Sequence, residues 1–367
     1  MPAPCAGDMP GHGIYRILVC RPNHRLGNML LMTPLIAELE RRYRGAEIDI
    51  VAEGGAARDV FASYFSVRNI YCLPLRGFKH PLAFLRLLAR IRRNRYDLVI
   101  DPCLGSGFSR ALTRIFRGRR KLGYGDAAHP RGLTHAVPSA AAPRHMAQRP
   151  VALVRWHDRS PPYATADFPP LDIRLSAHER AQGRQLVGEL LQHSGQHADG
   201  PVIGIFANAT GAKRYSGDWW RSFIAAMRLA LPSCRLIEVV PAHGGSMLEG
   251  EWPGYYSTSI RRMAAVMSAV DLMVSADCGV MHLAVASGVA TAGLFSVTDE
   301  AVYGPYGSGC SVRSGDRDGV AAVVAGVLAA LPPVCGASAG AIGGTAPTET
   351  GGSLRPHASA AGEAQPC

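Results

Sequence analysis

Apolar runs of strand length alternate with segments of helical periodicity along most of the chain. The runs lie at 15–21, 46–52, 68–74 and 96–101 in the first half, and at 201–207, 234–240, 271–276 and 290–295 in the second. Uninterrupted apolar runs are typical of strands buried on both faces, and intervening helices favour parallel sheets. The pattern predicts an α/β protein with two Rossmann-like, doubly wound domains. Their strand ends would face each other across a ligand-binding cleft.

Two segments interrupt this alternation and define the predicted domains. The stretch 159–172 contains four prolines and no periodicity, as in a linker. A helix then begins after Ser176, with Glu179 completing a capping box. Beyond 332 the chain is rich in Gly, Ala and Pro, which is typical of disorder. We therefore expect an N-terminal domain at 1–165, a C-terminal domain at 166–332 and a disordered tail at 333–367.

The first apolar run leads into a turn with three polar side chains. RLGNMLLMTPL at 25–35 follows the run and precedes a charged helical segment. The pattern is strand, glycine turn and helix, with Asn23, His24 and Asn28 at the turn. Such a turn at the mouth of a helix favours a binding site.

A similar turn occurs in the second half, in ADCGVMHLAVASGV at 276–289. Asp277 ends a predicted strand, Gly279 permits a tight turn, and His282 lies one helical turn later. The free N–H groups of a helix start attract anions, and Asp277 can accept hydrogen bonds from hydroxyl groups. The simpler interpretation, an Asp cap and a histidine packed on the sheet, also stays open.

A polar loop, FANATGAKRYSGDWW at 206–220, follows the first strand of the second half. Lys213 and Arg214 stand just before a predicted helix, where they could meet a phosphate. The alternative is a solvated loop. Because the whole chain has only three lysines, the position of Lys213 favours a functional role.

The charge of the chain is unevenly distributed. Residues 1–165 contain 26 Lys and Arg against 11 Asp and Glu, whereas residues 166–367 contain 13 against 17. This asymmetry predicts that the first half meets an anionic partner. The helical segment 79–95 is expected to place Leu82, Leu85, Leu88 and Ile91 near one stripe and Arg86, Arg90 and Arg93 on another. Together with the basic cluster 116–121, this basic stripe suggests an anionic membrane surface. A solvated polar face is the alternative, and nucleic acid is not expected because aromatic residues do not interleave with the basic ones.

Other compositional features favour a reduced, cytoplasmic protein. The nine cysteines are scattered singly without a CxxC pair, so neither a disulfide framework nor a zinc site is expected. The N-terminus shows no secretory apolar region, and no apolar stretch is long enough to span a membrane.

Three motifs together resemble glycosyltransferase family 9, the ADP-heptose:lipopolysaccharide heptosyltransferases. They are RLGNMLLMTPL, DCGVMHLAVASGVATAGLFSVTD at 277–299 and YGPYG at 303–307, and the resemblance covers about residues 14–332. It implies the GT-B fold and an inverting, metal-independent transferase without a cofactor. The implied donor is a nucleotide-diphosphate sugar, with ADP-heptose favoured. The implied acceptor is an anionic lipid-linked glycan, such as the lipopolysaccharide core, at the inner face of the inner membrane.

The resemblance also assigns roles to particular residues. Those of the donor site would be Thr210, Lys213 with Arg214 as the alternative, Asp277, Cys278, Gly279 and His282. The acceptor loop would include Arg25 and Gly27, and Asn28 stands where the family has an aspartate taken as the general base. Cys278 also departs from the family's Ser or Thr.

Asn28 raises a chemical question, because an amide cannot take a proton from an acceptor hydroxyl at neutral pH. We expect Asn28 to orient that hydroxyl, with His24, four residues upstream, as the candidate base and Asp101 as a second one. An exposed loop histidine and a helix-capping aspartate are the respective alternatives. A relic that binds a nucleotide sugar or glycan without turnover stays open. An oxidoreductase or epimerase is disfavoured because no GxGxxG follows the first strand.

Overall fold

The computed structural model describes residues 9–10, 12–75, 79–125, 132–156, 168–196, 199–241, 245–314 and 319–332. Residues 1–332 form one compact unit. The predicted domain boundary at 165/166 and the predicted disorder of 333–367 fall outside the described residues, and both stay predictions.

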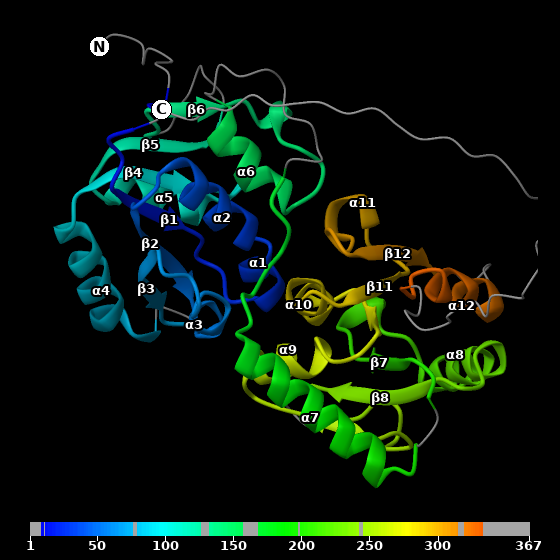
Figure 1. Ribbon diagram of the computed structural model, residues 1–367. Helices are drawn as coiled ribbons and strands as arrows, with labels where there is room; N and C mark the ends of the chain where they lie inside the picture. The colour runs from blue at the N-terminus through cyan, green and yellow to red at the C-terminus, as the bar shows by residue number, and fades with distance from the viewer. Residues whose placement is uncertain are drawn as a thin grey trace, which may run out of the picture. The chain divides into compact units, whose positions relative to one another are not determined.

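Two six-stranded sheets, parallel throughout, organise this unit (Figure 1). The first has the order β3-β2-β1-β4-β5-β6 and the second the order β12-β11-β10-β7-β8-β9. Strands of the first sheet are β1 (Arg16–Cys20), β2 (Glu47–Glu53), β3 (Val67–Leu73), β4 (Tyr96–Asp101), β5 (Gly118–Tyr124) and β6 (His135–Val137). Strands of the second are β7 (Val202–Phe206), β8 (Arg235–Val240), β9 (Gly254–Tyr256), β10 (Leu272–Ala276), β11 (Ala290–Phe295) and β12 (Gly309–Arg313).

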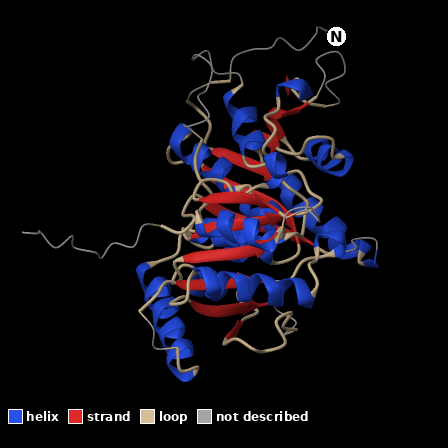
Figure 2. Cartoon of the chain, turned by 90° about the vertical axis from the view of Figure 1, so that its right-hand side faces the viewer, coloured by secondary structure: helices blue, strands red, loops and turns tan. Residues whose placement is uncertain are grey.

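Helices flank the strands of both sheets, as the blue ribbons around the red arrows in Figure 2 show. Those of the first half are α1 (Leu26–Leu30), α2 (Thr33–Arg42), α3 (Ala56–Val60), α4 (Pro81–Arg93), α5 (Gly107–Ile115) and α6 (Gln148–Arg155). Those of the second are α7 (Ala177–His193), α8 (Gly217–Ala230), α9 (Ile260–Met267), α10 (Gly279–Ser287), α11 (Glu300–Tyr303) and α12 (Val320–Leu328).

All eight predicted strands are confirmed, and the four strands that the sequence did not reveal lie toward the outside of the sheets. These are β5, β6, β9 and β12. They are short or carry charged residues, because a strand near a sheet edge has less apolar surface to bury. The predicted capping box at Ser176 and Glu179 is confirmed as well: Glu179 N donates to Ser176 Oγ at 3.2 Å, and Ser176 N donates to Glu179 Oε2 at 2.8 Å.

The buried side chains form three apolar clusters. One is shared by the two halves and includes Ile17 and Leu35 from the first with Phe206 and Leu283 from the second. A separate cluster lies between the first sheet and helices α4 and α5, and another between the second sheet and helices α8 and α12. The shared cluster brings α1 beside α10, as Figure 1 also shows.

Helix α4 corrects one expectation. The predicted apolar stripe of 82, 85, 88 and 91 is only half right, because Leu82 and Leu85 are 67% and 59% exposed. Ile91 is buried, and Phe84, Leu87 and Leu88 pack against the same cluster. The packing face is therefore rotated toward Phe84 and Leu87, and two leucines are left at the surface. None of the described helices is long and apolar enough to span a membrane.

Candidate active site

The two predicted glycine turns meet each other. Gly27 is in α1, which follows β1, and Gly279 begins α10, which follows β10. A Cβ added at Gly27 would lie 3.2 Å from the Cα of Gly279 and 3.0 Å from Cδ2 of His282. A Cβ added at Gly279 would lie 2.9 Å from the backbone nitrogen of Gly27. Glycine at both positions therefore lets the two helix starts approach backbone to backbone.

Asn28 is held by hydrogen bonds on both ends of its amide. Its Oδ1 accepts from Nη2 of Arg21 at 3.1 Å, and its Nδ2 donates to Oδ1 of Asn23 at 3.0 Å. The same Asn23 oxygen accepts from the backbone N–H of Arg25 at 2.9 Å. The amide of Asn28 is thus fixed in orientation, as a positioning residue requires.

Arg21 is a site residue that the sequence did not single out. It directly follows β1, and its Nη1 lies 3.0 Å from Sγ of Cys103. Its Nε is buried without a hydrogen-bond partner among the described residues. Together with Asn28, Arg21 lines a small cavity of about 50 Å³ that Met146 and Arg149 also border. No local pattern marks Arg21, because its partners converge only in the fold.

The candidate bases differ in their surroundings. His24 is exposed, and its Nδ1 lies 3.4 Å from Oε2 of Glu53. Asp101 is fully buried and bound: its Oδ1 accepts from Ser109 Oγ at 2.6 Å, and its Oδ2 accepts from Arg110 Nε at 2.8 Å. Asp101 therefore binds side chains of the first turn of α5, but it is not the cap of that helix, because the N-cap residue is Ser106. The catalytic role of His24 stays a prediction.

In the second half the structure brings Lys213 and Asp277 together. Lys213 Nζ lies 2.6 Å from Oδ2 of Asp277, an ion-pair distance. The ammonium therefore balances the charge of the buried carboxylate, and Oδ2 receives no other donor among the described residues. A charged pair with an unused acceptor direction can receive a hydroxyl group from a ligand.

Arg214 and Thr210 lie differently from Lys213. Both are exposed, and Arg214 Nη2 lies 2.9 Å from Sδ of Met247. Arg214 also borders a separate cavity of about 660 Å³ whose wall includes Tyr215 and Trp219. Of the two candidate cations, only Lys213 pairs with Asp277, which favours it as the cation of the donor block.

His282 and Cys278, which the sequence also predicts for the donor site, are both uncharged. Burial lowers the pKa of His282 to about 4, so the ring is neutral near pH 7. Its Nδ1 is buried and has no hydrogen-bond partner within the described part of the chain. Burial likewise raises the pKa of the Cys278 thiol, which therefore stays protonated. Because His282 and Cys278 are neutral, the positive features of this turn are the Lys213 ammonium and the free N–H groups at the start of α10.

A second contact joins the halves, beside the predicted YGPYG loop at 303–307. His145 Nε2 lies 3.1 Å from the carbonyl oxygen of Gly304, and the His145 ring stacks on Tyr306 at 4.8 Å. Arg144 forms an ion pair with Asp299 at 2.9 Å. The sequence gave no sign of these partners, because the contacts join residues 155 and 159 positions apart along the chain.

No group of three or more His, Cys, Asp or Glu side chains that could hold a metal ion occurs among the residues that the structure describes.

The sequence model of glycosyltransferase family 9 (heptosyltransferase) matches residues 84–319. The chain belongs to glycosyltransferase family 9. No curated protein gives a significant match by sequence. Among solved structures, the family 9 glycosyltransferase of Veillonella parvula DSM 2008 is 17% identical with a TM-score of 0.68, over 84% of this chain and 88% of that one.

Two Escherichia coli proteins have the same fold. Heptosyltransferase WaaC with ADP is 20% identical with a TM-score of 0.62, over 82% of this chain and 93% of that one. The ADP-heptose lps heptosyltransferase II is 18% identical with a TM-score of 0.61, over 86% and 98%. The two parallel sheets of this family 9 member thus have the predicted GT-B architecture.

Proposed function

We propose that this family 9 glycosyltransferase moves a sugar, with inversion, from a nucleotide-diphosphate donor to a lipid-linked bacterial glycan. The observation that carries the proposal is the Lys213–Asp277 pair beside the start of α10, at the carboxyl end of β10. A cation and a helix start together suit a diphosphate. Asp277 is suited to accept a hydrogen bond from a donor hydroxyl.

The chemistry follows from these placements. Lys213 and the first N–H groups of α10 would stabilise the negative charge that develops on the departing diphosphate, and no metal ion is required in this scheme. Asn28, fixed by Arg21 and Asn23, would orient the acceptor hydroxyl. The proton would leave to His24 or to solvent. Because His24 is exposed and only weakly engaged by Glu53, it is free to turn.

The known structures guide the choice of donor. One relative was solved with ADP and with ADP-2-deoxy-2-fluoro heptose, and another is described as an ADP-heptose lps heptosyltransferase. On this basis we propose ADP-heptose as the donor and the lipopolysaccharide core, or a related surface glycan, as the acceptor.

A transfer assay tests this proposal. Purified protein is incubated with ADP-heptose and a truncated core acceptor, and the glycan product is measured by mass spectrometry. GDP- and UDP-linked sugars serve as comparison donors. Product from ADP-heptose, reduced at least about tenfold in Lys213→Ala, would support the proposal. No product from any of the three donor classes would contradict it for this acceptor class.

One observation favours a second candidate, a protein that binds the donor or glycan without turnover. Both polar atoms of Asn28 are already hydrogen-bonded, and an amide is not a base. Calorimetric binding of ADP without any transfer would identify this case.

We also propose that the first half touches an anionic membrane. Helix α4 presents the exposed Leu82 and Leu85 together with basic residues of its own. Each cation near such a surface contributes about 1 kcal/mol. Reversing Arg86, Arg90 and Arg93 to Glu should abolish association with anionic vesicles, and the wild-type association should weaken as salt rises. Salt-independent association would contradict this contact.

A further inference from the structure

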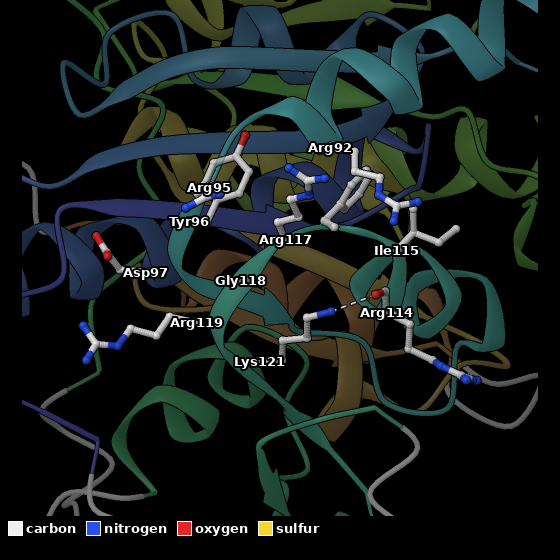
Figure 3. A pocket seen from close by; sticks show the side chains of 11 residues that line it. Arg92, Arg95, Tyr96, Asp97, Arg114, Ile115, Arg117, Gly118, Arg119 and Lys121 are labelled. Atoms are coloured by element: carbon white, nitrogen blue, oxygen red, sulfur yellow. Dashed lines mark hydrogen bonds between the residues drawn. The ribbon is translucent and has the colours of Figure 1, made fainter.

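A second basic feature lies at the amino ends of the strands of the first sheet. A cavity of about 730 Å³ opens there, between the last turn of α4, the end of α5 and the first residues of β4 and β5. Figure 3 shows its lining around Gly118. Asn28 follows the carboxyl end of β1, so this cavity lies at the edge of the parallel sheet opposite to the candidate active site.

The charged side chains that line the cavity are almost all positive. Six cations border the cavity, and Asp97 is the single acid among its lining residues. Oδ2 of Asp97 already accepts hydrogen bonds from the backbone N–H groups of Tyr15 and Arg16, at 2.9 and 3.0 Å. The six cations are Arg92, Arg95, Arg114, Arg117, Arg119 and Lys121.

Within the described part of the chain, none of these six side chains forms an ion pair with an acid. Like charges that share a cavity repel one another, and a bound anion would remove that repulsion. Among the described residues, the positive charge on this face therefore has no counterion.

Part of this lining is held in place by the fold. Lys121 Nζ donates to the carbonyl oxygen of Arg114 at 2.8 Å. Gly132, at φ 87°, packs so closely on the stem of Arg114 that an added Cβ would lie 2.5 Å from Cγ. Burial lowers the pKa of Lys121, and the charges of Arg114 and Arg92 lower it further. An anion in the cavity would counteract these effects.

We propose that this cavity binds a ligand bearing phosphate groups with at least two negative charges. Guanidinium groups match phosphate oxygens with two parallel hydrogen bonds, and several arginines from different elements can surround one such group. The volume lies within the range of small-molecule sites. The site is separate from the donor block at Lys213, and it does not depend on the proposed transferase activity.

Two sources could supply this chemistry: the phosphate headgroup of a lipid, or a free phosphorylated molecule. Arg119 and Arg120 offer a matched pair to test the site, because neighbouring strand residues point to opposite faces and only Arg119 lines the cavity. Arg119→Gln and Arg120→Gln therefore remove the same charge from the same strand.

Pyrophosphate is the first probe, titrated by calorimetry into the full chain carrying Lys213→Ala, which weakens the donor site. We expect Arg119→Gln and Arg117→Gln each to weaken binding roughly tenfold or more, because each removes a charged hydrogen-bond donor. Arg120→Gln should change it less than about twofold. Equal affinity in Arg119→Gln and Arg120→Gln, or no binding at all, would overturn the proposal. Melting curves of each variant verify folding.

Competing vesicles distinguish the two sources. If vesicles rich in phosphatidic acid displace pyrophosphate better than vesicles of phosphatidylglycerol with equal surface charge, the ligand is a lipid headgroup. Binding of pyrophosphate that neither vesicle displaces assigns a free ligand, and both results support the site. Displacement that persists unchanged in Arg119→Gln would place the vesicle contact elsewhere and contradict the lipid assignment.

Discussion

The turns after β1 and after β10 share one backbone plan, but they differ in how far protein groups satisfy their polar side chains. Each leads from a strand through a glycine into a helix, and the two glycines touch. In the first turn, both polar atoms of Asn28 are hydrogen-bonded to protein groups. In the second, Nδ1 of His282 is buried without a hydrogen-bond partner among the described residues, and Oδ2 of Asp277 is engaged by the Lys213 ammonium at 2.6 Å.

This difference in hydrogen bonding suggests a different task for each turn. A buried polar atom without a partner costs about 1–3 kcal/mol, which a ligand can recover by supplying a hydrogen bond. The amide of Asn28 is already hydrogen-bonded, so a ligand restores no lost hydrogen-bond energy there. What this amide offers is a fixed orientation. The second turn is therefore suited to gripping a ligand, whereas the first is suited to holding one side chain still.

The largest expected effect comes from restoring an acid in the first turn. Asn28→Asp would place a carboxylate next to Arg21, whose charge favours the ionised form. If the site lacks only its base, the transfer rate should rise by up to ~10²–10⁴. Single-turnover transfer from ADP-heptose measures this change.

Two controls interpret that result. Asn28→Ala removes the orienting amide, so it should slow transfer. His24→Ala should cost about the same factor of ~10²–10⁴ only if His24 acts as the base. Equal rates in all three variants and the wild type would show that the first turn takes no part in the chemistry.

In the second turn, Lys213→Ala should slow transfer by ~10²–10³, the usual cost of losing one group that stabilises developing negative charge. Arg214→Ala is the matched control, since Arg214 is exposed and lies against Met247. Arg214→Ala should slow transfer by less than about tenfold. Steady-state rates and ADP calorimetry test both variants, and a larger loss in Arg214→Ala would reverse the assignment of the two cations.

The burial of His282 predicts a pH effect on stability. Its pKa is about 4 in the folded chain because of burial, against ~6.5 for an exposed histidine. Between these pH values the unfolded chain binds a proton that the folded chain does not. The free energy of unfolding should therefore fall, by up to about 3 kcal/mol, as the pH drops from ~6.5 to ~4.

Urea unfolding across this pH range measures the effect in the wild type and in His282→Asn. The variant should show a flatter dependence on pH, whatever its absolute stability. An unchanged slope would mean that His282 is not held neutral by burial.

The smallest expected effect comes from the contact between the two turns. Gly27→Ala would bring a Cβ within 3.0 Å of the His282 ring and 3.2 Å of the Gly279 Cα, so the helices must shift slightly. We expect a loss of ~1–3 kcal/mol in the free energy of unfolding. Gly107→Ala is the control, because nothing lies within 4 Å of an added Cβ there. Similar denaturation midpoints for the two variants would contradict the tight contact.

The sequence predicted the central strands because they are buried on both faces and therefore apolar throughout. It did not predict β5, whose residues GRRKLGY carry three positive charges. Its sequence indicates a basic surface cluster, which describes its side chains but not its backbone. An outer strand is held by hydrogen bonds to its neighbour, and these leave no mark on the pattern of apolar residues.

The same distinction applies to the candidate site. Gly27, Asn28, Asp277 and His282 were found because each stands beside a predicted strand end. Arg21 was not, because no spacing links it to Cys103, which lies 82 residues away along the chain. Local spacing identifies groups that a turn presents, whereas pairings between distant segments follow only from the fold.

The touching glycines have a thermodynamic consequence. Gly27 is next to Asn28 on α1, and Gly279 starts the helix that carries His282, so a shift of one helix start against the other displaces both turns together. If donor binding moves this contact, the affinity for the acceptor changes by some factor. Linkage then requires the acceptor to change the affinity for the donor by that same factor. The acceptor turn and the donor turn would in this way share one free energy of coupling, carried by a contact between the backbones of two glycines.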